Sequence, residues 1–140
     1  MTTDCIFCRI VAGTAAASIV YDDALTMAFL DMRQPSPGHV LVVPKWHVRD
    51  ILAMDDATGA AIMSTVARVA RAVHTAFAPD GMNISQSNGE AAGQEVFHLH
   101  MHVLPRHSGD GLLRMYDAIP EMPPRAELDE LAAALRAAIA

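Results

Sequence analysis

Three histidines, His98, His100 and His102, alternate with apolar residues in the run 96–104. In an extended strand successive side chains point to opposite faces, so the three imidazoles would share one face and the apolar residues the other. An imidazole has an ordinary pKa of about 6.5 and is an uncharged nucleophile at neutral pH, able to displace a leaving group at phosphorus. We therefore expect the middle ring, His100, to attack phosphorus between two further donors.

Two other interpretations of the histidines remain open. Their spacing could arise by chance on a solvated strand, or the three rings could bind one zinc ion and form a zinc hydrolase. Four residues of strand span about 13 Å, whereas Zn–N bonds are about 2.0 Å long. The outer rings would have to lean strongly toward one point, so the spacing favours the nucleophile.

The loop before the histidines is suited to binding an anion. Asn88-Gly89 and Gly93-Gln94 offer amide donors and backbone N–H groups that no large side chain covers. Such local donors matter because the chain has a formal net charge of −6 and repels anions overall. No cluster of Lys and Arg is present in the sequence, which argues against nucleic acid as a partner.

Cys5 and Cys8 form a Cys-x2-Cys pair near the N-terminus. This spacing is typical of half a zinc site, which needs two further ligands. A redox role of the thioredoxin type is disfavoured because no strand precedes the pair. The remaining alternative is two free thiols in a short helix.

Length and composition indicate an ordinary globular protein. The 140 residues fit a single domain, 1–140, with 52% hydrophobic and 19% charged residues. No apolar run approaches the roughly 20 residues of a membrane helix, and Asp4 and Cys5 stand where a secretory signal would be basic and then apolar. We expect a cytoplasmic protein without a membrane partner.

Hydrophobic periodicity and turn residues predict the elements. Apolar residues at steps of three and four indicate a long helix over 55–77, and Leu128, Leu131, Leu135 and Ile139 indicate a C-terminal helix. The fold class is α+β, an antiparallel sheet covered on one side by helices. The other expected elements are a short helix over 6–12, an irregular segment over 108–124, and strands over 18–21, 25–31, 39–43, 82–85 and 96–104.

Several motifs together resemble the histidine triad (HIT) family. Residues 93–104 resemble its His-x-His-x-His signature, and the segments 5–10, 28–31, 37–39 and 43–47 resemble its other motifs in the same order. The resemblance covers about residues 4–106, and the tail over 107–140 lies where branches of the family differ. It implies a five-stranded antiparallel sheet with two main helices, and a homodimer in which two sheets join edge to edge.

The resemblance also implies a mechanism. His100 would attack the α-phosphorus of a purine nucleotide derivative, such as one of AMP or GMP, and water would hydrolyse the nucleotidyl-histidine. The substrate would be a nucleoside phosphoramidate or a dinucleoside polyphosphate. The galactose-phosphate uridylyltransferase branch of the family has a glutamine at the position of His102. The histidine in this chain therefore favours hydrolysis over nucleotidyl transfer. The implied nucleotide-binding residues are Ile6, Phe7, Ile10, Phe29 and Leu30 around the base, Asp31 at the ribose, and Asn88, Gly93, Gln94, Glu95 and His102 at the phosphate.

Bacterial members of the family resemble this chain in the pattern that completes the cysteine pair. His47 and His98 are the implied third and fourth ligands, and four protein ligands would close a structural zinc site. His98 would then be unavailable for catalysis. His39, His74 and His107 receive no functional role.

Two departures from the family pattern favour an alternative function, a non-catalytic nucleotide-binding protein with a degraded site. Ser87 stands where an asparagine is common, and Glu95 where a serine or threonine donates to the phosphate or leaving group. An ionised glutamate can accept hydrogen bonds but cannot donate them. Either its side chain points away from the histidine face, or it lies beside the leaving group and favours a cationic amine. We hypothesise the second, which would select phosphoramidates over polyphosphates.

Overall fold

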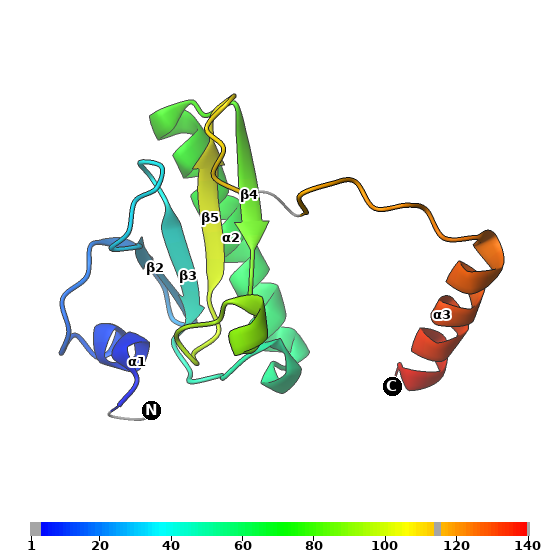
Figure 1. Ribbon diagram of the computed structural model, residues 1–140. Coiled ribbons are helices and arrows are strands. Elements are labelled where there is room, and N and C mark those ends of the chain that lie inside the picture. The colour runs from blue at the N-terminus through cyan, green and yellow to red at the C-terminus, as the bar shows by residue number, and fades with distance from the viewer. Residues whose placement is uncertain (1–3, 114–115, 140) are drawn as a thin grey trace. The chain divides into compact units, whose positions relative to one another are not determined.

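The computed structural model describes residues 4–113 and 116–139 (Figure 1). The chain divides into two compact units, Met1–Asp110 and Gly111–Ala140. The first unit holds the sheet and every residue for which the sequence predicts a role. The assignment of 1–140 to a single domain stays a prediction.

The first unit is built on a five-stranded sheet whose strand order is β1-β2-β3-β5-β4. Each neighbouring pair is antiparallel, which confirms the expected α+β fold with a five-stranded antiparallel sheet. The helices of this unit are α1 (Ile6–Val11) and α2 (Asp56–Phe77), with short 3-10 turns at Ile51–Ala53 and Glu90–Ala92. The strands are β1 (Ile19–Asp22), β2 (Thr26–Leu30), β3 (Val40–Pro44), β4 (Gly81–Ser85) and β5 (Met101–Arg106).

Helix α2 lies across one face of the sheet, where it contacts β2, β3 and β5, and it passes behind β5 and β4 in Figure 1. It begins where the Asp55 carboxylate accepts from the backbone N–H of Thr58 at 2.7 Å, an N-cap, and it ends at Ala78 in the left-handed conformation. The predicted helix over 55–77 is therefore confirmed to within one residue. Its buried stripe consists of Ile62, Thr65, Val66, Val69 and Val73.

The opposite face of the sheet is also covered, so the expectation of one covered side was wrong. Phe7 and Ile10 of α1 pack against Met27, Phe29, Leu41 and Val43, whereas Ala28, Val40 and Val42 face α2. The cause is visible in β3, whose residues Val-Leu-Val-Val-Pro are apolar on both faces. A strand of this composition needs cover on both sides, and α1 supplies it on the second.

The predicted strand over 96–104 has a different extent, because β5 begins only at Met101. The residues before it satisfy their polar groups outside the ladder. Leu99 donates its backbone N–H to the carbonyl of Val48 at 2.6 Å, and the His98 ring donates through Nε2 to the carbonyl of Pro44 at 2.8 Å. The alternation of faces continues through this segment although the strand pairing does not.

The second unit contains α3 (Arg125–Ala138), which confirms the predicted C-terminal helix. Residues 111–113 and 116–124 form neither helix nor strand, as expected of the irregular segment. No side chain of α3 is buried. Across the described parts of the chain, no helix combines the length and hydropathy needed to span a membrane.

Candidate active site and metal centre

A cavity of about 940 Å³ opens on the face of the sheet that α1 covers. Its volume is that of a small-molecule site. A smaller cavity, of about 420 Å³ beside Trp46, is lined by none of the predicted site residues. Most of the predicted site residues line the large cavity: Ile6, Phe7, Ile10, Phe29, Leu30, Asp31, Gly93, Glu95, His100 and His102.

His100 has a defined orientation in this cavity. Its Nδ1 lies 2.7 Å from the backbone carbonyl oxygen of His98. A carbonyl oxygen can only accept, so Nδ1 carries a proton, and the Nε2 of the neutral ring keeps its lone pair. The ring of Phe7 meets the imidazole edge to face, with centroids 5.1 Å apart. A histidine held in this tautomer can act as a nucleophile through Nε2.

His102 is joined to a fourth histidine, His39, for which the sequence predicted no role. The Nε2 of His39 lies 2.9 Å from the Nδ1 of His102, and the Nδ1 of His39 lies 3.7 Å from a carboxylate oxygen of Asp31. His39 is buried and lines the cavity. The sequence did not single out His39, but the structure joins Asp31, His39 and His102 in one connected chain.

The position of the protons on this chain decides what His102 can do. The carbonyl of Arg33 lies 3.3 Å from the Nδ1 of His39, so that nitrogen carries a proton. When His39 donates through Nε2 to the Nδ1 of His102, the proton of the neutral His102 ring resides on its own Nε2. Burial lowers the pKa of His102 to about 4, and His100 and His39 act in the same direction. The His102 ring is therefore neutral at pH 7, and it can donate through Nε2 when His39 is the donor of the hydrogen bond between the two rings.

The sequence contains a signal for His39, but it requires the strand pairing. Leu41 pairs with His102 across β3 and β5, so their side chains share a face. His39 precedes Leu41 by two residues and lies on the same face. Gly38 fixes the entry into the strand: its φ is +99°, and a Cβ there would lie 2.7 Å from the ring of Phe77.

The amide side chains of Asn88 and Gln94 do not line the cavity. Gln94 is buried, accepts from the backbone N–H of Gly89 at 2.7 Å and donates to the carbonyl of Arg49 at 2.9 Å. Asn88 accepts from the backbone N–H of Ile51 at 2.9 Å. These two side chains shape the loop, and only its glycine, Gly93, reaches the cavity wall.

Glu95 lines the cavity and does not point away from it. Its carboxylate is paired with the guanidinium of Arg33, whose Nη1 lies 3.1 Å and 3.4 Å from the two oxygens. Arg33 also lines the cavity, and the sequence did not identify it. No motif marks this arginine, and its partner lies 62 residues away.

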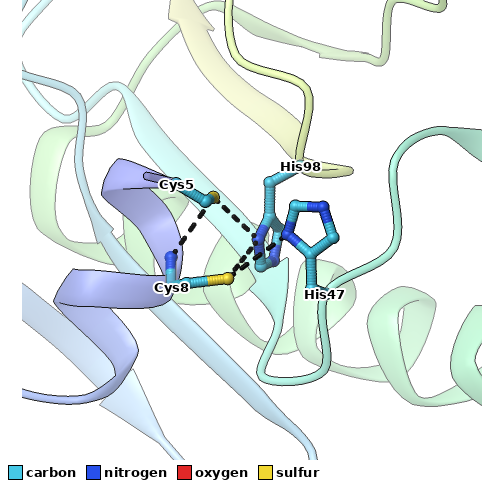
Figure 2. A group of neighbouring side chains, drawn as sticks. All are labelled: Cys5, Cys8, His47 and His98. Atoms are coloured by element: carbon cyan, nitrogen blue, oxygen red, sulfur yellow. Dashed lines mark hydrogen bonds between the residues drawn. The ribbon is translucent and has the colours of Figure 1, made fainter. Parts of the chain in front are cut away.

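The four predicted metal ligands converge beside α1, as Figure 2 shows. Cys5 caps the helix and Cys8 lies in its first turn, His47 follows β3, and His98 precedes β5. The Nδ1 of His98 lies 3.4 Å from the sulfur of Cys5 and 3.5 Å from that of Cys8. The Nδ1 of His47 lies 3.3 Å from the sulfur of Cys8.

These separations fit a tetrahedral zinc ion. Zn–S bonds of about 2.3 Å and Zn–N bonds of about 2.0 Å place sulfur and nitrogen ligands about 3.5 Å apart. His98 is fully buried, and its Nε2–H donates to the carbonyl of Pro44, which leaves Nδ1 free to bind a metal. Such a hydrogen bond on the second ring nitrogen is usual for a ligating histidine. The donor set and its geometry therefore suit a closed structural site.

The triad is divided between two sites. The His98 ring faces the cysteines, whereas His100 and His102 line the cavity. Asp31, His39 and His102 also lie close enough to be considered as a metal site, but the 2.9 Å contact between the two rings is a hydrogen bond that uses one nitrogen of each. One zinc ion bound by all three triad histidines does not fit this arrangement.

Known proteins are similar to this chain over most of its length. The HIT domain family matches residues 12–109. "Protein hit" of Bacillus subtilis is 44% identical over 109 residues, which are 77% of this chain and 75% of that protein. An adenosine 5'-monophosphoramidase of Schizosaccharomyces pombe is 38% identical over 102 residues, 73% of this chain and 74% of that protein. The crystal structure of a zinc-bound histidine triad family protein from Mycobacterium smegmatis is 38% identical, with a TM-score of 0.74 over 97% of this chain and 98% of that one. The chain belongs to the histidine triad family.

Proposed function

We propose that this protein hydrolyses nucleoside 5'-phosphate derivatives through a nucleotidyl intermediate on His100. The observation that carries the proposal is the hydrogen bond from His100 Nδ1 to the His98 carbonyl, at 2.7 Å, which leaves Nε2 as a nucleophile in the cavity. The phosphoramidase activity named for the yeast relative supports it.

The reaction has two steps. In the first, the lone pair of His100 Nε2 attacks the α-phosphorus, the bond to the leaving group breaks, and its electron pair departs with the leaving group. The His102 Nε2–H supplies the proton that this group takes up. In the second, water attacks the same phosphorus and returns a proton to His102, and the P–N bond to His100 breaks to release the nucleoside monophosphate.

Different residues around the cavity would bind the base, the ribose and the phosphate of the nucleotide. The apolar side chains of α1 and β2 would enclose a purine base, and Asp31 would accept the ribose hydroxyls. The backbone at Gly93 would donate to the phosphate, while the side chains of Asn88 and Gln94 act by holding that loop in place. Zinc on Cys5, Cys8, His47 and His98 would tie the N-terminus to the sheet. A homodimer also remains part of the proposal, with β1 and β4 as the edge strands of the sheet.

The direct test is to trap the intermediate. Protein mixed with an adenosine 5'-phosphoramidate and quenched in base, where phosphohistidine-type bonds survive, should carry AMP on the peptide containing His100 by mass spectrometry. A non-catalytic binding protein would bind AMP with no covalent adduct and no turnover. A hydrolase that uses zinc to activate water would turn over without the adduct and lose activity in chelator at a temperature where it stays folded.

Asp31 provides a test of the binding mode. Asp31→Ala should weaken AMP binding at least tenfold and 2',3'-dideoxy-AMP binding less than threefold, because the carboxylate pairs with the two hydroxyls that the second ligand lacks. Isothermal titration of both ligands measures this, with Asp22→Ala outside the cavity as the matched control. Equal losses for the two ligands would remove Asp31 from the ribose site.

A further inference from the structure

Arg33 and Glu95 form an ion pair on the wall of the cavity that contains His100. Arg33 follows β2 and Glu95 precedes the histidines, and Arg33 Nη1 lies 3.1 Å from the nearer carboxylate oxygen. Both side chains are largely exposed, 80% and 71%. An ion pair this exposed adds little to folding stability, so its position on the cavity wall is better explained by a ligand.

The pair is the main source of fixed charge on this wall. Arg33 is the only lysine or arginine among the described residues that line the cavity, and Glu95 and Asp31 are the acids. Asp31 is already engaged, because it accepts from the backbone N–H of Arg33 at 2.9 Å and faces His39. The Arg33 guanidinium has further N–H donors, and the Glu95 carboxylate has further lone pairs.

Adjacent charges of opposite sign discriminate among leaving groups. A group with only a positive charge would be attracted by Glu95 and repelled by Arg33, and a group with only a negative charge would meet the reverse. A group with an N–H donor next to a carboxylate satisfies both, because the N–H donates to Glu95 and the carboxylate accepts a bidentate pair from Arg33. An α-amino acid has these two groups, one carbon apart.

We propose that Arg33 and Glu95 select the leaving group, and that the preferred substrate is a nucleoside 5'-phosphoramidate of an α-amino acid, joined to phosphorus through its amino nitrogen. This inference rests on the proposed function and specifies its substrate class. When His100 attacks, the P–N bond breaks, its electron pair stays on nitrogen, and His102 gives that nitrogen a proton. The free amino acid then leaves with its carboxylate on Arg33 and its amine on Glu95. With this one proton the nitrogen is a neutral amine that donates N–H to Glu95, so the charge of the leaving group lies on the carboxylate that Arg33 binds. This differs from the cationic leaving group expected from Glu95 alone.

The experiment compares two substrates that differ only in the carboxylate, the adenosine 5'-phosphoramidates of glycine and of glycinamide. We expect the wild-type protein to hydrolyse the glycine compound with a kcat/KM at least tenfold higher. Arg33→Gln should reduce this ratio at least tenfold. Arg68→Gln, which removes an exposed arginine that packs on Tyr21 outside the cavity, should keep the wild-type ratio.

A double variant separates selection from a merely structural ion pair. Arg33→Glu combined with Glu95→Arg keeps a salt bridge but exchanges its charges, so a structural role is restored while the match to the amino acid is lost. We expect the glycine preference to be absent in this variant. A ratio that is the same in the wild type, Arg33→Gln and the exchanged pair would overturn the inference and leave the proposed function intact. Hydrolysis of neither compound by the wild type would contradict the proposed function as well.

Discussion

Replacing His100 with asparagine is expected to lower kcat by at least a thousandfold while changing the Kd for AMP by less than about tenfold. Asparagine has no nucleophilic nitrogen, so the covalent route is lost, whereas the apolar walls and Asp31 that bind the nucleotide remain. Steady-state hydrolysis of an adenosine 5'-phosphoramidate and titration with AMP measure the two quantities on the same preparation.

His107→Asn is the matched control for this change, because His107 is exposed and does not line the cavity. It should retain wild-type values of both kcat and Kd. If His100→Asn keeps more than a few per cent of the wild-type rate, His100 is not the nucleophile and the reaction proceeds by direct attack of water.

Removal of zinc is expected to lower the melting temperature by at least about 15 °C. Free zinc at about 1,000 times its Kd stabilises the folded protein by about 4 kcal/mol, and about 4 °C or more is lost per kcal/mol in a unit of this size. The rate at 10 °C should fall less than tenfold, since the cysteines and His47 do not line the cavity. Elemental analysis should find one zinc per chain in protein purified without chelator.

His47→Ala tests the same site without chelator. It should lose zinc and melt at the temperature of the chelated wild type, and added chelator should then have no further effect. His74→Ala, at an exposed position on α2, should retain both zinc and stability. Protein that contains no zinc by elemental analysis, or a melting temperature that chelator does not change, would contradict a structural zinc ion.

The sequence predicted those parts of the fold that depend on local patterns. The steps of three and four from Ile62 to Phe77 predicted α2. The alternation around His100 correctly separated the face of His100 and His102, which line the cavity, from the apolar face. The same alternation placed the start of the strand too early, at residue 96 and not at Met101. Alternation indicates which side chains are buried, but not which backbone groups form hydrogen bonds with a neighbouring strand.

The residues that the sequence missed depend on contacts between distant segments. His39 contacts His102 only because β3 and β5 are neighbours, and no local pattern encodes that pairing. Arg33 was missed for the same reason, since only the fold places it beside Glu95. The side chains of Asn88 and Gln94 were predicted to bind phosphate, and the structure places them against backbone groups of neighbouring loops instead. An amide side chain suits either partner equally well.

His98 makes polar contacts through three of its atoms, and these contacts do not depend equally on the cysteines. Its Nδ1 faces the thiols, its Nε2–H is bound by the Pro44 carbonyl, and its own carbonyl orients the His100 ring. Cys5, Cys8 and His47 would lose their shared partner if the metal were absent. His98 would keep its hydrogen bond with the Pro44 carbonyl, because that contact does not involve the metal. Replacing His98 would therefore leave the Pro44 carbonyl without this donor, whether or not zinc is bound.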